Sequence, residues 1–196
     1  MKINLEEVFN RIIDDFEYFC RVCIIVPARQ WKKPPEEAED IVDIPLILSS
    51  KQRGYIEYLN RKDIPDKVIL KARQRGYSTV TLAYILWKIL FGYNENIIYS
   101  IDHGVKAKEM ARLMRRMFAQ IPDVFKPKGL IWRSQPDRAT NTRRNNQLLM
   151  KTADEELGRS GTLTQNFADE FASYKQNIQE SIAASLTSGC PNNRVW

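Results

Sequence analysis

One stretch of the chain combines basic, glycine and hydroxyl residues in a spacing that suits phosphate binding. It reads KARQRGYST over residues 71–79, after the apolar run at 68–70 and before an apolar segment at 80–91. A strand, a tight turn and a helix in this order are the usual setting of a phosphate-binding loop. The first turn of such a helix presents N–H groups without helical partners and the positive end of the helix dipole. We expect Gly76 to bring the backbone close to a phosphate and Ser78 to reach a magnesium ion.

This stretch departs from the consensus G-x-x-x-x-G-K-[ST] at two positions. Lys71 stands where the first glycine is expected, and Tyr77 stands where the lysine is expected. Because the lysine side chain has a four-carbon stem, we expect Lys71 to fold back over the loop and supply the cation. The predicted phosphate-binding residues are Lys71, Arg73, Gln74, Arg75, Gly76, Tyr77, Ser78 and Thr79. Taken alone, the stretch can also be read as an ordinary basic connection between a strand and a helix.

A second stretch places two carboxylates at the end of a segment with strand-like composition. It reads TLTQNFADE over residues 162–170 and ends in Asp169 and Glu170. Phosphoryl transfer needs an acidic residue that holds hydrated magnesium and a carboxylate that orients or deprotonates the attacking water. We predict that Asp169 has the first role and Glu170 the second. The alternative is a helix start with acidic residues in its first turn.

Together, KxRQxGxST, the GRSGT at residues 158–162 and the DEFA at residues 169–172 resemble the ATPase domain of the large terminase of tailed double-stranded DNA bacteriophages. In that family the loop lysine is often displaced to the front, as Lys71 is here. The resemblance extends from about Ile44 to the C-terminus. It implies an α/β, three-layer P-loop NTPase of the ASCE type with a mostly parallel central sheet. We therefore divide the chain into an N-terminal helical and linker segment packed on the motor domain (1–43) and a P-loop ATPase domain (44–196).

The resemblance also suggests roles for residues outside the two stretches. Arg159 matches an arginine finger that reaches the γ-phosphate of a neighbouring subunit, with Arg73 as the competing candidate. Gln52 matches a glutamine that reads adenine through its amide, although it could be an ordinary surface residue. Thr187 matches a coupling motif at the end of the next strand, although residues 187–189 could also form a helix C-cap at Gly189.

The resemblance implies that the chain binds ATP and Mg²⁺. It also implies that ATP hydrolysis drives double-stranded viral DNA into a procapsid. The implied partners are double-stranded DNA, the portal protein, the small terminase subunit and further copies of the chain in a ring, with a monomer expected in isolation. The implied location is the host cytoplasm, docked transiently on the procapsid portal. Two alternatives stay open: another P-loop nucleic-acid motor, such as a helicase, or a nucleotide- or DNA-binding domain without turnover. The family's nuclease domain would not fit in the printed sequence, so we expect no nuclease activity from this chain.

Charge is distributed unevenly along the 196 residues. The formal net charge is +6, with 43% hydrophobic and 28% charged residues, which is the composition of a globular protein. Residues 1–44 hold six basic and ten acidic side chains, whereas residues 105–144 hold eleven basic and three acidic ones. The second segment is either a solvated basic face or a surface that contacts DNA phosphates. We interpret Cys20 and Cys23 as small buried apolar residues, and we find no signal peptide or membrane-spanning run.

Apolar periodicity and turn residues predict the remaining elements. The predicted helices are 5–19, 51–60 (with Ser50 as N-cap), 80–91, 105–121 and 174–186. The predicted strands are 67–70, 96–100, 130–132, 147–151 and the segment that ends at Asp169. Residues 21–27 could continue the first helix or form a strand, and residues 28–43 are expected to form an exposed linker.

Overall fold

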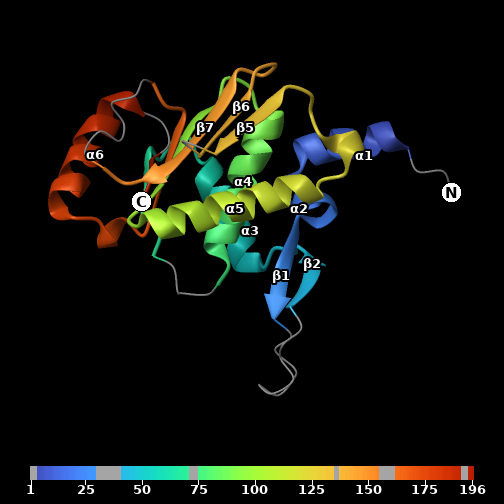
Figure 1. Ribbon diagram of the computed structural model, residues 1–196, viewed down its shortest axis with the longest axis horizontal. Coiled ribbons are helices and arrows are strands. Elements are labelled where there is room, and N and C mark those ends of the chain that lie inside the picture. The colour runs from blue at the N-terminus through green and yellow to red at the C-terminus, as the bar shows by residue number, and fades with distance from the viewer. Residues whose placement is uncertain (1–3, 30–40, 71–74, 135–136, 155–161, 191–193) are drawn as a thin grey trace.

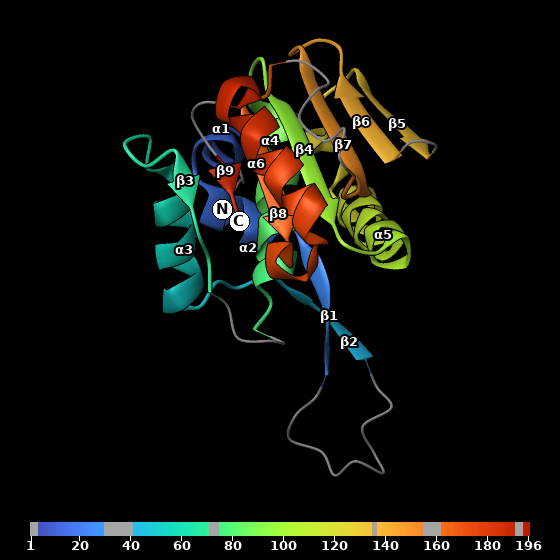
Figure 2. The same cartoon turned by 90° about the vertical axis from the view of Figure 1, so that its left-hand side faces the viewer.

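The computed structural model describes residues 4–29, 41–70, 75–134, 137–154, 162–190 and 194–196 of the chain. A central sheet forms the middle layer, helices cover both of its faces, and a β-hairpin projects away from the body (Figures 1 and 2). Within these residues, no helix combines the length and the apolar character needed to cross a membrane.

The central sheet has seven strands in the order β3-β9-β8-β4-β7-β6-β5. The first five run parallel to their neighbours, whereas β6 and β5 form an antiparallel edge. In this spatial order the strands are β3 (Asp66–Lys67), β9 (Arg194–Val195), β8 (Gln165–Asp169), β4 (Asn96–Ile101), β7 (Asn146–Thr152), β6 (Asp137–Asn141) and β5 (Leu130–Ser134). The expected mostly parallel sheet is confirmed.

Both faces of the parallel strands are covered. Alternate residues of β4 enter different hydrophobic clusters, as the two-residue period of a strand requires. Ile97 and Tyr99 join the larger cluster, with residues of α1, α2, α4 and α5, and Ile98 joins the smaller cluster under α6. The helices are α1 (Leu5–Asp14), α2 (Phe16–Cys23), α3 (Ser50–Asn60), α4 (Tyr77–Phe91), α5 (Gly104–Gln120) and α6 (Gln176–Gly189). The three-layer α/β architecture is therefore also confirmed.

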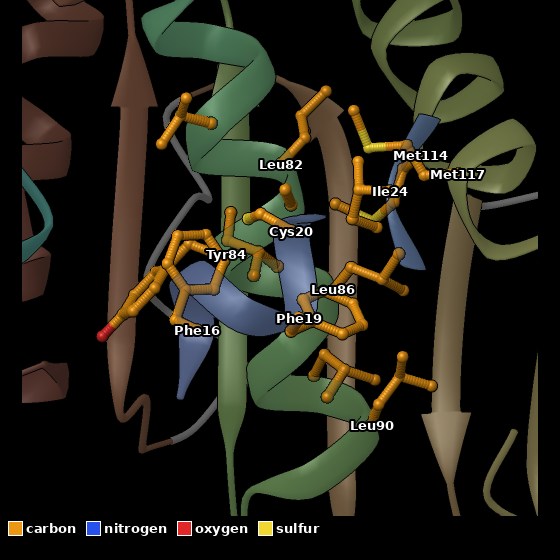
Figure 3. Close-up of a cluster of buried hydrophobic side chains, with 14 of the residues drawn as sticks. Phe16, Phe19, Cys20, Ile24, Leu82, Tyr84, Leu86, Leu90, Met114 and Met117 are labelled. Carbon is orange, nitrogen blue, oxygen red and sulfur yellow. The ribbon is translucent and has the colours of Figure 1, made fainter. Parts of the chain in front are cut away.

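Helix α4 lies at the centre of the larger cluster. Ten of its fifteen residues are buried, so it is apolar on nearly all sides, as expected of a helix enclosed in a core. Figure 3 shows Phe16, Phe19 and Cys20 of α2 packed beside Tyr84 and Leu86 of α4. The sheet and the N-terminal helices thus hold α4 between them.

The N-terminal segment is more structured than its composition suggested. The single helix expected over 5–19 is two helices, because Asp15 adopts an extended conformation and its side chain caps α2 by accepting a hydrogen bond from the Tyr18 N–H. The Trp87 indole N–H donates to the Ile12 carbonyl, which ties α4 to α1. Cys20 and Cys23 are buried and are not joined by a disulfide, as expected.

Residues at both ends of the expected linker form a hairpin. Strand β1 (Ile25–Arg29) pairs antiparallel with β2 (Ile41–Pro45), and both contain β-branched residues that favour strands. The Arg116 guanidinium pairs with Asp43 at 2.7 Å and so links the hairpin to α5. Strand β2 spans the division placed between residues 43 and 44, which stays a prediction.

The remaining differences concern the ends of elements. Ser49, not Ser50, caps α3, in a reciprocal capping box with Gln52. Strand β3 is Asp66–Lys67 and shares only Lys67 with the expected strand 67–70, although the Ile69 N–H still donates to the Trp196 carbonyl at 3.0 Å. Strand β6 was not predicted, because Asp137–Asn141 is polar and lacks an apolar alternation.

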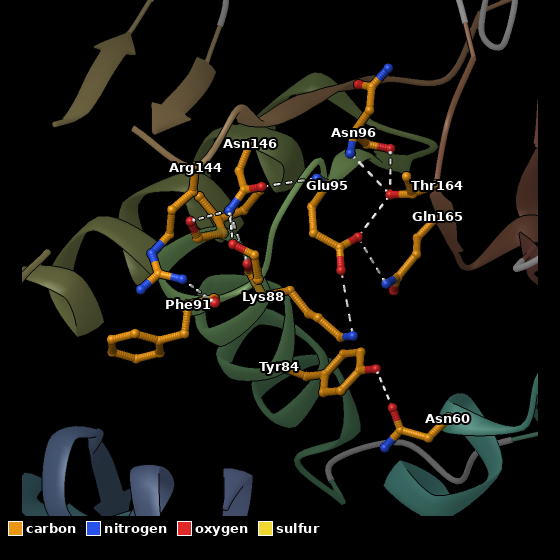
Figure 4. A network of polar contacts seen from close by, with 12 residues as sticks. Asn60, Tyr84, Lys88, Phe91, Glu95, Asn96, Arg144, Asn146, Thr164 and Gln165 are labelled. Carbon is orange, nitrogen blue, oxygen red and sulfur yellow. Dashed lines mark hydrogen bonds and ion pairs between the residues drawn. The ribbon is translucent and has the colours of Figure 1, made fainter. Parts of the chain in front are cut away.

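The C-terminal end of α4 is fixed by polar side chains from the β6–β7 region (Figure 4). The Asn146 side-chain N–H groups donate to the carbonyls of Lys88, Ile89 and Gly92 at 3.4, 3.0 and 2.8 Å. The Arg144 guanidinium donates to the Phe91 carbonyl at 2.7 Å. Carbonyls that a helix end leaves without partners are satisfied here.

Candidate functional site

The N-terminal end of α4 is built around a glycine. Gly76 precedes the helix with φ of +71°, in the left-handed region, and offers no side-chain cap. A Cβ atom at this position would lie 3.2 Å from the Gln52 amide nitrogen. Gly76 is thus required both by its backbone conformation and by the close approach of α3.

A hydrogen bond joins the two stretches that the sequence singled out. The Ser78 hydroxyl, in the first turn of α4, donates to Oδ2 of Asp169, the last residue of β8, at 2.9 Å. The two residues are 91 positions apart in the chain. The structure therefore brings the predicted metal-binding pair together at the carboxyl end of a parallel strand, where ligands of open α/β sheets bind.

A buried tyrosine also contacts this carboxylate. The Tyr99 hydroxyl, from the adjacent strand β4, donates to the same Asp169 Oδ2 at 2.7 Å. Burial, and then the neighbouring Asp169 charge, raise the pKa of Tyr99 well above its usual value, so the phenol keeps its proton and remains a donor. Sequence reasoning missed Tyr99, because the pairing of strands far apart in the chain gives no local signal.

Glu170 stands in a constrained backbone position beside Asp169. Its φ of +58° is uncommon for a residue other than glycine, and such conformations cluster at functional sites. Lys106 of α5 donates to Glu170 Oε2 at 2.5 Å and also lies 3.7 Å from Oδ1 of the nearly buried Asp102. The hydrogen bond to Glu170 is the main cause of the raised pKa of Lys106. Lys106 and Asp102 were not predicted as site residues.

Tyr77 fills the position of the consensus lysine with a packed aromatic ring. It meets the ring of Tyr55 edge to face at 5.3 Å. The Tyr55 hydroxyl lies 2.7 Å from the Thr81 hydroxyl, which itself donates to the Tyr77 carbonyl at 2.9 Å. Burial is the main cause that raises the pKa of Tyr55 to about 12. The side chain of Tyr77 cannot supply a cation, so the cation has to come from elsewhere.

A cavity of about 1320 Å³ lies over this region. The described residues that line it include the loop end Arg75–Thr79, the carboxylates Asp169 and Glu170, and Lys106. Its other wall is largely apolar and includes Val68, Leu70, Phe171 and Trp196. Ring centroids of Phe171 and Trp196 lie 4.7 Å apart.

The other predicted site residues are distributed as follows. Arg75 and Thr79 line the cavity. Gln52 contacts the loop from α3, where its amide nitrogen donates to the Arg75 carbonyl at 3.0 Å. Lys71, Arg73, Gln74 and Arg159 lie outside the described residues.

The expected position of Thr187 at the end of a strand is wrong. Residue 187 lies in the last turns of α6, which ends at Gly189, ahead of β9. Because β9 runs parallel to β8, its start faces the sheet edge opposite to the one that carries Asp169. The Thr-Ser-Gly sequence therefore lies at the end of a helix, but the C-cap is Cys190 and not Gly189, as the alternative given by the sequence had it.

The residues present fit a magnesium ion. This ion prefers oxygen ligands and is usually held by one or two carboxylates together with substrate phosphates and water. Ser78 and Asp169 present a hydroxyl and a carboxylate oxygen 2.9 Å apart at the cavity wall. In the described part of the chain, no group of three or more His, Cys, Asp and Glu residues could enclose a metal ion, so substrate oxygens and water would have to complete such a site.

The strand order and this geometry define a three-layer α/β domain with the fold of P-loop proteins. Strand β9 lies between β3, which leads toward the loop, and β8, which carries the carboxylates. The helix that follows the loop begins where the carboxylate strand ends.

Solved structures of bacteriophage large terminases share this fold. The HK97 large terminase matches 95% of this chain with a TM-score of 0.68 at 13% identity, and the chain spans 36% of that protein. A large terminase from a thermophilic bacteriophage in complex with ADP matches 76% of the chain (TM-score 0.52, 14% identity), which spans 37% of it. A Thermus phage large terminase ATPase domain also matches 76% (TM-score 0.55, 13% identity), and the chain spans 64% of it. The likeness predicted from the sequence is therefore confirmed at the level of the fold. No protein-family profile and no curated protein sequence matches the chain.

Proposed function

We propose that the chain is the ATPase domain of a phage large terminase and hydrolyses ATP to move double-stranded DNA into a procapsid. The observation that carries this proposal is the Ser78–Asp169 hydrogen bond beside Glu170, at the open end of α4. A hydroxyl and two carboxylates at a helix N-terminus are the parts that phosphoryl transfer requires. The shared fold with phage terminases, one of them in complex with ADP, supports the choice of motor.

The phosphates of ATP would bind at the N-terminus of α4. The backbone N–H groups of Tyr77, Ser78 and Thr79 belong to the first turn of α4 and form the positive end of the helix dipole. Gly76 lets the chain turn tightly just before them. Because Tyr77 is packed on Tyr55, Lys71 is our candidate for the cation near the β- and γ-phosphates. Arg73, Gln74 and Arg75 complete the proposed loop.

Hydrolysis requires a group that orients the attacking water. We assign this role to Glu170, whose carboxylate lies at the cavity and would accept a hydrogen bond from the water that attacks the γ-phosphorus. Asp169 and Ser78 would hold Mg²⁺, and when bound this ion neutralises charge on the phosphate oxygens. The hydrogen bond from Tyr99 orients the Asp169 carboxylate for that purpose.

Coupling to DNA would use the basic segment 105–144. Lys108, Arg112, Arg133, Arg138 and Arg143 are exposed on α5, β5, β6 and the turn after β6, whereas Arg115 is paired with Asp137 and Arg116 with Asp43. Exposed cations of this kind bind phosphates without reading the sequence of bases. The proposed partners are double-stranded DNA, the portal protein and the small terminase subunit. The proposed assembly is a ring of copies, docked on the portal in the host cytoplasm, in which Arg159 reaches a neighbour's γ-phosphate.

Phosphate release measured with and without double-stranded DNA tests the proposal. We expect turnover that rises with DNA and with protein concentration, because Arg159 would act between copies. Glu170→Gln should keep nucleotide affinity and lower turnover at least ~100-fold, since general acid–base groups contribute about that much or more. A chain that binds ATP but never releases phosphate under any of these conditions would contradict the motor. Wild-type turnover in Glu170→Gln would remove Glu170 from the proposed role.

A further inference from the structure

Both ends of the Gln52 side-chain amide are engaged within the protein. Its oxygen accepts a hydrogen bond from the Ser49 N–H at 2.9 Å, in the capping box of α3. Its nitrogen donates to the Arg75 carbonyl at 3.0 Å, which is the last carbonyl before Gly76. These two bonds use one N–H group and one oxygen lone pair of the amide, and together they fix its orientation.

Helix α3 gives this contact a rigid support. Ile56 and Leu59 are buried in the larger hydrophobic cluster, and the Asn60 side chain accepts a hydrogen bond from the Tyr84 hydroxyl of α4 at 2.7 Å. The Arg53 guanidinium forms two hydrogen bonds to Glu17 of α2, at 2.8 and 2.9 Å. The amide of Gln52 is therefore held at a fixed place relative to α4.

In the described part of the chain, the cavity wall next to the loop combines apolar side chains with the ion pair between Asp66 and Arg194. Val68 and Leu70 are 65% and 97% exposed, and with Phe171 and Trp196 they offer surfaces on which a base can pack. Gln52 does not belong to the residues that line the cavity. A nucleotide in this cavity would therefore contact the loop that Gln52 holds and not the Gln52 amide itself.

We infer that Gln52 is a positioning residue for the phosphate-binding loop, and that it acts on a bound nucleotide through the Arg75 carbonyl and not through the base. The inference rests on the proposed function. Gln52 fixes the carbonyl of Arg75 and the turn at Gly76, and through them the direction of the first N–H groups of α4. A preorganised loop binds a phosphate chain more tightly than a mobile one.

Gln52→Met tests this inference, because methionine has a similar length and no charge but makes neither hydrogen bond. Affinities for ATP, GTP and inorganic tripolyphosphate are measured by calorimetry with magnesium, on the full chain. We expect an equal loss of affinity of about tenfold for all three ligands in the variant. In the ligand-free protein, hydrogen exchange at the Val80 N–H, which donates to the Gly76 carbonyl, should become faster.

Ser49→Ala is the matched control, since it weakens the cap of α3 and leaves the Gln52 amide in place. It should change none of the three affinities by more than about twofold. A Gln52→Met loss that spares tripolyphosphate would overturn the inference, as would unchanged exchange at Val80. A wild-type chain that binds none of the three ligands would instead overturn the proposed function.

Discussion

The two ends of helix α4 are completed in opposite ways. At the C-terminal end, side chains of Asn141, Arg144 and Asn146 donate hydrogen bonds to carbonyls of the last turns and of Gly92 (Figure 4). At the N-terminal end, the cap is Gly76, which has no side chain to donate or accept. The same buried helix thus has one end satisfied by the protein and one end that faces a cavity.

This difference separates what holds the fold from what binds a ligand. Amide and guanidinium donors at the C-terminal end interact with the negative end of the helix dipole and satisfy its carbonyls. The positive end keeps its backbone donors beside Ser78 and the Asp169 carboxylate. Changes at the C-terminal end should therefore affect stability, and changes at the N-terminal end should affect affinity.

The largest expected effect on the free energy of unfolding is at the C-terminal end of α4, where side chains satisfy the helix carbonyls. Asn146→Ala removes donors to three carbonyls and the acceptor for the Glu95 N–H. The Lys88 and Ile89 carbonyls keep bonds from the Gly92 N–H and from Asn141, whereas the half-buried Gly92 carbonyl and Glu95 N–H lose the partner that Asn146 provides. We expect the free energy of unfolding to fall by about 3 kcal/mol, measured by urea denaturation. Nucleotide affinity should stay within about twofold, because the site lies at the other end of α4.

Gln147→Ala is the control for this prediction. Gln147 is exposed and is the next residue of the same strand. Its replacement should change stability by less than about 0.5 kcal/mol. Equal losses of unfolding free energy in the two variants would show that the hydrogen bonds of Asn146 to the end of α4 do not account for the effect.

Gly76→Ala tests the open end at its backbone. Alanine at φ of +71° is strained, and its Cβ atom would lie 3.2 Å from the Gln52 amide nitrogen. We expect stability to fall by about 1–2 kcal/mol and phosphate affinity to fall with it. Gly54→Ala is the matched change in helix α3, where a Cβ atom would meet open space, and it should stabilise the chain by about 0.5–1 kcal/mol.

The sequence predicts the N-terminal end of α4 much better than its C-terminal end. The loop, its glycine and its serine could be read locally, because a strand, a turn and a helix lie consecutively in the chain. Asp169 and Glu170 could be placed at a strand end for the same reason. The pairing of Ser78 with Asp169 followed only because parallel strands present their carboxyl ends at one edge of a sheet.

The C-terminal end of α4 could not be predicted in this way. Asn141 and Asn146 lie in a segment without apolar alternation, and β6, which ends at Asn141, was missed for that reason. Tyr99 and Lys106 were missed as site residues because their contacts depend on strand order and helix placement. Thr187 was misplaced because a Thr-Ser-Gly sequence ends helices as readily as it follows strands.

Ser78→Ala should affect binding with little effect on the fold. The Ser78 hydroxyl is half-buried, and Asp169 would keep its hydrogen bond from Tyr99. We expect ATP affinity to fall about tenfold in the presence of magnesium and to change little in EDTA, which calorimetry can measure. Equal loss in both conditions would show that Ser78 acts on the phosphates directly and not through the metal.

The last prediction concerns Tyr99, the residue that orients Asp169. Tyr99→Phe removes one hydrogen bond and keeps the ring, which is 1% exposed. We expect the free energy of unfolding to change by about 1 kcal/mol or less. The variant loses one hydrogen bond, but it also no longer has to bury a hydroxyl group. Removing a group that orients a metal ligand typically weakens metal binding by about 10- to 100-fold, so half-maximal turnover should require more magnesium. Tyr174→Phe removes a different buried hydroxyl, which donates to Ser100, and should leave the magnesium requirement unchanged. If both variants raise the magnesium requirement equally, the effect comes from general loosening of the sheet. Metal binding at the N-terminal end of α4 would then not depend on a fixed orientation of Asp169.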